Sequence, residues 1–476
     1  MNIKMLAFLG LASMAAAAGA VPETNDSAKS FPRFYDQIEV LADMILESQI
    51  EEGGIGNYVI KEGQSSPVFM TTYTFGPLGL LKAYQMSGKE EYLEAAKKFV
   101  DFWFERQNVR PDRWGIVGTF YDQSKENGVI TDHIYTKERS LSNAGGPGYD
   151  ASDSDGPMVS LTAYNYYLLT GDIEILQNYA DGCKLIGDSI IATYDFRDSL
   201  TYCHPNYKVK YLMDVCEVYH QIKALAGIFE VLDSVIKERV SDGNFASYKV
   251  WNYHFLSENY KQIAQDMKES ILSLWNEQEK WYYWAKDVKG KKQHCRWDRM
   301  YPDTQEQIWP MLWYVTSPDM KQSKEVWENL NQNHPKWHET DLEWPSTSTV
   351  AIKMQDFEKA ETHISRILSE MKPNPAWETN DKHLMIHNCC FDFDIEGCCR
   401  MVKGSLAVKD NECRFQITAA IDGSAKIKVR KSVVDDARIM VNSKPAKIKE
   451  YAGYYIYEFD AKKSDIKDIS FKIAKD

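Results

Sequence analysis

The segment Gly148–Gly171, GYDASDSDGPMVSLTAYNYYLLTG, places three carboxylates directly before an apolar helical stretch. Gly156-Pro157 marks the helix start, because proline is favoured at the first helical position. Apolar side chains then recur at helical spacing, at Met158, Leu161, Tyr164 and Leu168. Asp150, Asp153 and Asp155 therefore lie at the positive end of a helix dipole, where unpaired N–H groups favour anions. Either one of them caps the helix and the others are solvated loop charges, or all three belong to a functional site.

Helical spacing of apolar residues continues from Phe31 to about Lys372. A tight turn, MSGKEEY at Met86–Tyr92, joins two helices, and a similar turn, LTGDIEIL, recurs at Leu169–Leu176. Recurring helical hairpins predict a repeat architecture. About twelve helices with alternating short turns and long loops fit an α/α barrel of six hairpins, with an inner and an outer ring. The last helix is placed near Cys390–Val402.

In such a barrel the loops before the inner helices meet at one mouth. These loops are predicted at 73–74, 149–155, 208–214, 296–303, 339–344 and 387–394. From Gly404 the pattern changes to short segments of alternating polar and apolar residues separated by turns such as Asp422-Gly423, which indicates antiparallel strands. We therefore predict a catalytic α/α-barrel domain at 21–403 and an accessory β-sandwich domain at 404–476.

The first twenty residues, Met1–Ala20, have the pattern of a signal peptide: Lys4, an apolar stretch and a small-residue cleavage motif. We expect an exported protein, periplasmic or secreted, without a membrane span. The net charge of −13 argues against nucleic-acid binding, which needs clustered Lys and Arg. Nine cysteines without C-x-x-C spacing give no metal or cofactor prediction. The sequence does not predict an oligomeric state.

Further carboxylates stand at the starts of other predicted inner helices. YLMDVCEVYH, at Tyr211–His220, contains Asp214 and Glu217, and RWDRMYPDTQEQIWPMLW, at Arg296–Trp313, contains Asp303 and Glu306. An ordinary acidic first turn would explain the former pair, and a capping box would explain the latter. Pro310 is expected to kink its helix.

Carboxylate pairs in an aromatic-rich cleft meet the requirements of glycosidic bond cleavage. One carboxylic acid protonates the leaving oxygen, and a neighbouring like charge or desolvation keeps that acid protonated. We predict Asp153 as the general acid/base, with Asp214 or Asp303 as its partner. The predicted substrate-binding residues are Tyr149, Asp150, Asp155, Trp297, Arg299, Tyr301, Glu306 and Trp344. Arg139, Lys208, Lys210 and Arg299 are candidates for binding a uronate or sulfate group.

Other chemistries lack their motifs. The sequence has no G-x-S-x-G, H-E-x-x-H, Walker loop or G-x-G-x-x-G before a strand. The segments YDASDSD, YLMDVCEVY and MYPDTQEQIWP, together with the LTGD turn, resemble bacterial six-hairpin glycosidases over about residues 31–400. ASDSD is similar to the signature of glycoside hydrolase family eight, and the likeness to unsaturated glucuronyl hydrolases is comparable.

This resemblance implies an aspartate acting as general acid and base. The same superfamily includes polysaccharide lyases and sugar epimerases, which use His or Tyr. The sequence therefore predicts an exported glycoside hydrolase acting on an oligo- or polysaccharide. A lyase or epimerase on the same scaffold and a non-catalytic glycan-binding protein remain the alternatives.

Overall fold

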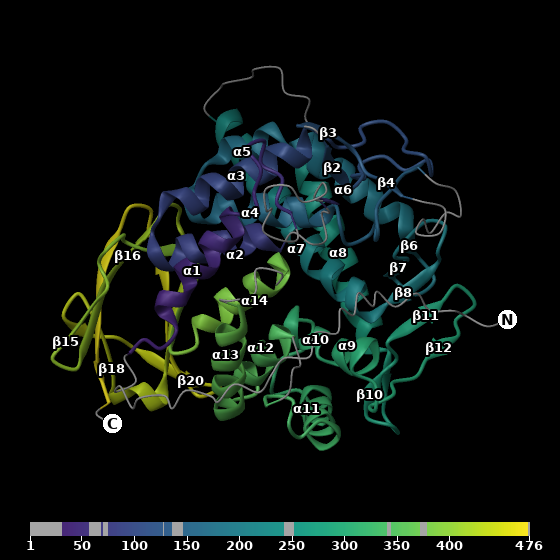
Figure 1. Ribbon diagram of the computed structural model, residues 1–476. Helices are drawn as coiled ribbons and strands as arrows, with labels where there is room; N and C mark the ends of the chain where they lie inside the picture. The colour runs from purple at the N-terminus through teal and green to yellow at the C-terminus, as the bar shows by residue number, and fades with distance from the viewer. Residues whose placement is uncertain are drawn as a thin grey trace.

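The computed structural model describes residues 31–56, 68–69, 75–126, 128–135, 146–241, 252–339, 344–371 and 378–474. The predicted signal peptide Met1–Ala20, Arg139 and the loop at 73–74 lie outside these ranges. Within them, no helix is both long and apolar enough to cross a membrane. The protein is rich in helices and carries antiparallel strands at its C-terminal side, as predicted (Figure 1).

Six helices form a closed ring, in which each contacts the next and the last contacts the first. They are, in order, α2 (Gly76–Ser87), α4 (Pro157–Thr170), α7 (Leu212–Ser241), α10 (Trp309–Leu312), α12 (Pro345–Lys353) and α14 (Thr379–Cys389). Side chains on every side of α2 are buried, which is expected of a helix with neighbours all round it. The hairpin glycines Gly88 and Gly171 end α2 and α4 with φ angles of 71° and 68°, a conformation that glycine adopts readily.

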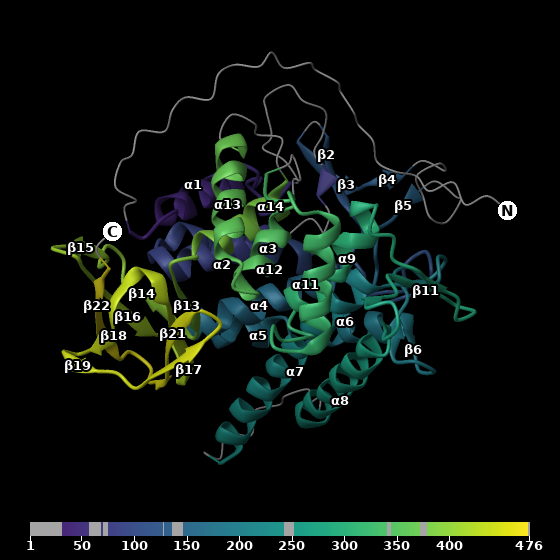
Figure 2. The same cartoon turned by 90° about the horizontal axis from the view of Figure 1, so that it is seen from below.

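A second set of helices packs outside this ring. It consists of α1 (Tyr35–Leu46), α3 (Glu90–Phe104), α5 (Ile173–Asn178), α6 (Ala180–Thr193), α8 (Tyr253–Leu272), α11 (Lys321–Asn333) and α13 (Phe357–Met371). In α3 the buried residues Tyr92, Ala96, Phe99 and Trp103 share one face at helical spacing. Figure 2 shows α7 and α8 side by side, in agreement with their extensive contact.

The segment around Pro310, which was expected to form a kinked helix, is broken into three parts. They are the π-type turn η1 (Met300–Thr304), α9 (Gln305–Gln307) and α10. The break falls at Ile308, and Pro310 stands in the first turn of α10, where its missing N–H leaves no hydrogen bond unmade. The predicted interruption by Pro310 is therefore confirmed.

Two antiparallel sheets follow the helices. One has the strand order β13-β17-β21-β20, and the other β14-β16-β22-β18-β19 with β15 beside β16. Their bounds are β13 (Phe393–Gly397), β14 (Cys399–Met401), β15 (Ala407–Lys409), β16 (Glu412–Ala419), β17 (Gly423–Arg430), β18 (Val434–Val441), β19 (Lys444–Pro445), β20 (Ile448–Tyr451), β21 (Tyr454–Ala461) and β22 (Ile466–Ile473). In β16, Cys413, Phe415, Ile417 and Ala419 are buried in strict alternation.

The helix predicted near Cys390–Val402 is wrong, because this segment forms β13 and β14. The preceding helix, α14, ends at Cys389. Phe391, Phe393 and Ile395 are buried and alternate with polar residues in FDFDIEG, which is the two-residue period of a strand. The sixth ring helix thus begins at Thr379, and the loop predicted at 387–394 does not precede it.

Short strands shape the loops between helices. They are β1 (Val68–Phe69), β2 (Gln123–Glu126), β3 (Val129–Asp132), β4 (Ile134–Tyr135), β5 (Gly146–Pro147), β6 (Tyr194–Asp195), β7 (Leu200–Thr201), β8 (Val209–Tyr211), β9 (Trp275–Asn276), β10 (Trp281–Tyr282), β11 (Ala285–Asp287) and β12 (Lys292–Gln293). The sheet β12-β11-β8 leads directly into α7 and so fixes the start of that ring helix.

Candidate active site

Carboxylates near the starts of α4, α7 and α9 influence one another. Asp214 in the first turn of α7 has a pKa well above its usual value. Burial is the main cause, and the negative charges of Asp153, Glu217, Glu306 and Asp150 add to it. These residues belong to the starts of α4, α7 and α9, so these three segments bring them within electrostatic reach of one another. We call these five residues the acidic cluster.

The three aspartates before α4 lie in different surroundings. Asp150 is exposed, yet nearby protein raises its pKa by desolvation. Asp153 has no exposed surface, and its Oδ2 accepts a 2.6 Å hydrogen bond from the Thr201 hydroxyl. Burial raises the pKa of Asp153 to about 7. Asp155 is also buried, and its Oδ2 accepts a hydrogen bond from Ala151 N at 2.9 Å.

The interpretation of one of these aspartates as a helix cap and of the others as solvated loop charges is therefore wrong. The N-cap of α4 is Gly156, which has no side chain. Two of the three aspartates are buried, and Asp150 is the member that reaches solvent. The predicted first-choice acid, Asp153, lies beneath the accessible surface of the site.

Two carboxylates of α7 stand on one helix face. Asp214 is half-buried, and Glu217, three residues on, is 6% exposed. The Trp309 indole N–H donates a 3.0 Å hydrogen bond to Glu217 Oε1. Burial raises the pKa of Glu217 to about 8. Glu217 was not among the predicted site residues, although its i,i+3 spacing from Asp214 is a signal for a shared face.

Asp303 and Glu306 do not form the capping box. Asp303 Oδ1 accepts a hydrogen bond from Arg296 N at 2.9 Å, and Arg299 Nε lies 3.6 Å from its other oxygen. Glu306 Oε2 accepts a hydrogen bond from Met213 N at 3.1 Å, so this buried side chain holds the start of α7. Asp303 thus stabilises its own loop, whereas Glu306 belongs to the acidic cluster and positions Asp214.

Aromatic side chains stand beside the acidic cluster. The rings of Tyr301 and Trp344 stack with centroids 5.3 Å apart and an interplanar angle of 14°. Tyr301 is 47% exposed, and its pKa is raised first by burial and then by Glu306 and Asp214. This pair has the form of a sugar-stacking wall.

The other two predicted aromatic residues are placed differently. The Tyr149 hydroxyl donates to Asp112 Oδ2 at 2.9 Å, and its ring packs on Trp114, so Tyr149 is part of a buried loop cluster. Trp297 is half-buried against the hydrophobic core.

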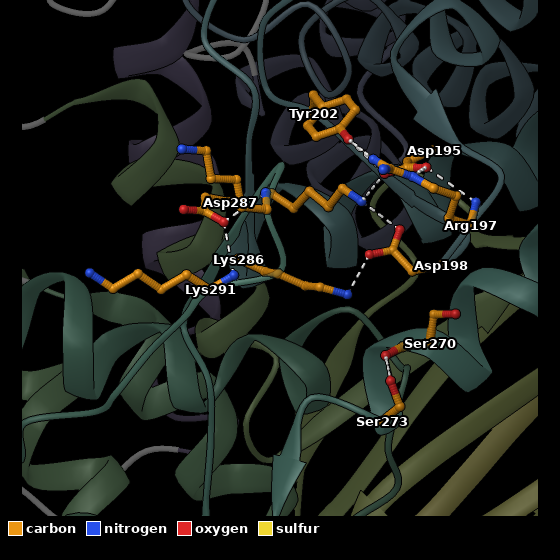
Figure 3. Close-up of polar contacts among 11 residues, drawn as sticks. Asp195, Arg197, Asp198, Tyr202, Ser270, Ser273, Lys286, Asp287 and Lys291 are labelled. Carbon is orange, nitrogen blue, oxygen red and sulfur yellow. Dashed lines mark hydrogen bonds and ion pairs between the residues drawn. The ribbon is translucent and has the colours of Figure 1, made fainter.

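The predicted anion-binding lysine Lys210 is already paired. Only 2% of its side chain is exposed, and its ammonium contacts Asp195 at 2.7 Å and also Asp198. Figure 3 shows the surrounding network, in which Arg197 pairs with Asp195 and Lys286 with Asp198. This network ties β6, β8 and β11 together. Lys208 is exposed, and Arg299 is engaged with Asp303 and the Tyr301 carbonyl.

No group of three or more His, Cys, Asp or Glu side chains in the described ranges is arranged to hold a metal ion. A cavity of about 260 Å³ lies away from the acidic cluster, on the outer side of α3 and α5. Its lining includes Lys97, Asp101, Asp172 and Tyr179, and none of the predicted site residues.

Comparison with known proteins finds similarity in structure alone. No family model and no curated protein matches the chain. An α-L-rhamnosidase from Dictyoglumus thermophilum is similar over 91% of this chain, with a TM-score of 0.50 and 10% identity. The match covers 49% of the rhamnosidase, so this chain spans about half its length.

Two further solved structures are similar. A D-mannose isomerase shares 12% identity, covers 77% of this chain and 98% of its own, and has a TM-score of 0.47. An unsaturated glucuronyl hydrolase specific for heparin shares 10% identity, covers 75% and 96%, and has a TM-score of 0.44. At 10% identity the rhamnosidase shows a shared fold and nothing more, and no family is assigned.

Proposed function

We propose that this protein is a glycoside hydrolase that acts on an oligo- or polysaccharide. On this proposal the ring of six helices is the inner ring of an α/α barrel, and the C-terminal sheets form an accessory β-sandwich. We also propose that Met1–Ala20 directs export. The observation that carries the functional proposal is Asp214, a carboxyl group with solvent access that is surrounded by four other carboxylates.

Asp214 is the proposed general acid. Its pKa stands well above the usual value of 3.8, so the carboxyl group keeps a proton to donate to the leaving oxygen. Asp150 is exposed and close enough to raise the pKa of Asp214, and it is the proposed base or nucleophile. Burial is the only cause that raises the pKa of Asp150, whereas burial and four neighbours act on Asp214, so Asp214 holds its proton more tightly.

Two buried residues assist without touching the substrate. Asp153 is the first neighbour that raises the pKa of Asp214. Glu306 fixes the backbone next to Asp214 through Met213 N. The Tyr301–Trp344 stack supplies the apolar surface on which a sugar ring would rest.

A sugar isomerase or epimerase is the second candidate. Ring helices α7 and α14 carry His220 and His383, the residue type that transfers protons at sugar carbons, although burial makes both weaker bases than free imidazole. Burial lowers the pKa of His220 to about 4 and that of His383 to about 3.

The direct test is incubation with a panel of saturated and 4,5-unsaturated oligosaccharides, followed by product analysis. The proposal expects water to be added across a glycosidic bond. New unsaturated products from saturated substrates would instead identify a lyase, and an intact sugar with changed configuration would identify an epimerase. Binding without turnover across the panel would favour a non-catalytic glycan-binding protein.

Replacing the exposed half of the aromatic stack should weaken substrate binding. Tyr301→Ala is expected to raise KM about tenfold, because an aromatic contact contributes about 0.5–1.5 kcal/mol beyond the area that it buries. Tyr451→Ala is a matched control, since Tyr451 in β20 is 49% exposed against 47% for Tyr301. Steady-state kinetics of both variants check this. An equal change of KM in both, or none in Tyr301→Ala, would contradict the assignment of the wall.

A further inference from the structure

The hairpin formed by β6 and β7 lies between the two segments that carry Asp153 and Asp214. Thr201 of β7 is fully buried, and its hydroxyl donates the 2.6 Å hydrogen bond to Asp153 Oδ2. The same strand packs against α7, the helix that begins two residues before Asp214. One short hairpin therefore contacts the side chain of Asp153 and the helix of Asp214.

Main-chain hydrogen bonds continue this link through Cys203, which follows β7. Ser152 N donates to the Cys203 carbonyl at 2.8 Å and so holds the residue directly before Asp153. Cys203 N donates to the Val209 carbonyl at 2.9 Å, and Val209 begins β8. Because β8 runs directly into α7, Cys203 joins the segments of Asp153 and Asp214 through its own N–H and carbonyl groups.

The side chain of Lys210, in the middle of β8, ties this strand to the hairpin. Its ammonium donates to Asp195 Oδ2 at 2.7 Å and also to Asp198. Lys286 of β11, the strand paired with β8, donates to the other oxygen of Asp198 at 2.6 Å (Figure 3). The turn between β6 and β7 is therefore bound to two neighbouring strands at once.

Asp195 has further partners within the hairpin. Arg197 donates to its two oxygens at 2.8 and 2.7 Å, and the Tyr202 hydroxyl donates to Oδ2 at 2.6 Å. These hydrogen bonds, that of Arg197 foremost, hold the pKa of Asp195 well below its usual range. Asp195 therefore stays ionised wherever activity is measured, and the network keeps this negative charge throughout.

The burial of Lys210 indicates a role in geometry. Only 2% of its side chain is exposed. The cost of taking an ammonium and a carboxylate out of water offsets most of their attraction, so a buried ion pair contributes little net stability. A buried charge must nevertheless keep its partners, because leaving it unpaired is costly. The network therefore restricts where β8 can lie relative to the hairpin.

We propose that Lys210 is a positioning residue, which sets the separation of Asp153 and Asp214 by holding β8 against the β6–β7 hairpin. Lys210 does not touch the substrate, and it acts through the hydrogen bonds of Thr201 and Cys203. This inference rests on the proposed function, in which Asp214 is the general acid.

The repulsion between two carboxylates falls as their separation grows. Asp153 is the first of the four members of the acidic cluster that raise the pKa of Asp214. Four other titratable side chains lie within electrostatic reach of Asp214, namely Cys203, Tyr211, Cys216 and Tyr301. If β8 is loosened from the hairpin, Asp153 and Asp214 can move apart, and the pKa of Asp214 should fall.

Lys210→Met and Tyr202→Phe test the proposal through the pH dependence of kcat/KM for an oligosaccharide that the parent protein cleaves. The alkaline limb should move to lower pH, by about one unit in Lys210→Met and by less in Tyr202→Phe. Above the limb, a shift of one unit lowers kcat/KM about tenfold. Tyr202→Phe keeps every charge and the aromatic ring, so it remains informative if loss of Lys210 impairs folding.

The direction of the shift separates positioning from a direct effect of charge. Lys210→Met also removes a positive charge, which alone would raise the pKa of Asp214 and move the limb to higher pH. A role in stability alone would lower Tm and leave the limb in place. In the double variant with Asp153→Asn, the two shifts should add to less than their sum, because Lys210 acts through Asp153.

Lys82→Met is the matched control. Lys82 of α2 is also buried, with 6% of its side chain exposed, and it pairs with Asp394 of β13 rather than with the hairpin. Its replacement is expected to lower Tm without moving the alkaline limb.

Urea denaturation follows the pKa of Asp214 without turnover. The difference in free energy of unfolding between Asp214→Asn and its parent changes with pH only up to the pKa of Asp214 in the folded protein. With Lys210→Met in both proteins, this change should end at lower pH. A protein that shows this shift but cleaves no oligosaccharide would keep the positioning role and reject the proposed function.

Two outcomes would overturn the positioning role and leave the proposed function intact. The first is hydrolysis whose alkaline limb is unchanged, or moves to higher pH, in either Lys210→Met or Tyr202→Phe. The second is a shift in Lys82→Met as large as that in Lys210→Met.

Discussion

Asp214→Asn is expected to lower kcat/KM for glycoside hydrolysis by about 10²–10⁴-fold, the usual contribution of general acid–base catalysis. Asparagine has almost the volume of aspartate but cannot donate a carboxylic proton. Asp214 is half-buried and its raised pKa keeps it neutral, so replacement by the neutral asparagine should not harm the fold. Steady-state kinetics, together with thermal melts of both proteins, measure the two effects.

Asp153→Asn provides the matched comparison. Asp153 has no exposed surface, and its negative charge is the first of the neighbours that raise the pKa of Asp214. Its replacement should lower the pKa of Asp214 and move the alkaline limb of the pH–rate profile to lower pH, while activity remains at acidic pH. If Asp153→Asn is inactive at every pH and Asp214→Asn is active, Asp153 is the acid and the present assignment is wrong.

Helical periodicity correctly predicted a helix-rich fold, because outer helices such as α3 and α13 have one apolar and one polar face. It failed for α14, whose sequence TNDKHLMIHNC shows no apolar stripe. This helix is one of the six in the ring, and its residues Lys382, His383 and Asn388 are buried beside Met385 and Ile386. A helix with neighbours on every side carries no amphipathic signal.

The sequence could place carboxylates at helix starts but not choose among them. Asp150 and Asp153 are three residues apart, and the backbone turn before α4 exposes one and buries the other. The sequence also does not predict that Lys210 is paired, because its partner Asp195 precedes it by fifteen residues and reaches it only through the pairing of loops. Long-range contacts of this kind leave no periodic pattern in the sequence.

The second prediction with a large expected effect concerns how Asp153 makes the free energy of unfolding depend on pH. In the unfolded chain Asp153 ionises near pH 3.8, whereas burial keeps it protonated in the folded protein up to about pH 7. Between these values the folded state binds more protons than the unfolded state, so the contribution of Asp153 to the free energy of unfolding falls as pH rises and is constant above about pH 7. Asp153→Asn removes this loss, since asparagine does not ionise.

The difference in free energy of unfolding between Asp153→Asn and the parent protein should therefore rise from pH 5 towards pH 7 and then level off, a change of a few kcal/mol at about 1.36 kcal/mol per pH unit. Urea denaturation at pH 5 and pH 8 measures this difference.

Thr201→Val is the companion variant, because the Thr201 hydroxyl lowers the pKa of Asp153 by donating a hydrogen bond to it. Without this bond Asp153 should keep its proton beyond pH 7, so the stability of Thr201→Val should go on falling where that of the parent is constant. If the difference in free energy of unfolding between Asp153→Asn and the parent does not change with pH, Asp153 is ionised in the folded protein. The negative charge of Asp153, which holds the proton on Asp214, would then be permanent rather than titratable.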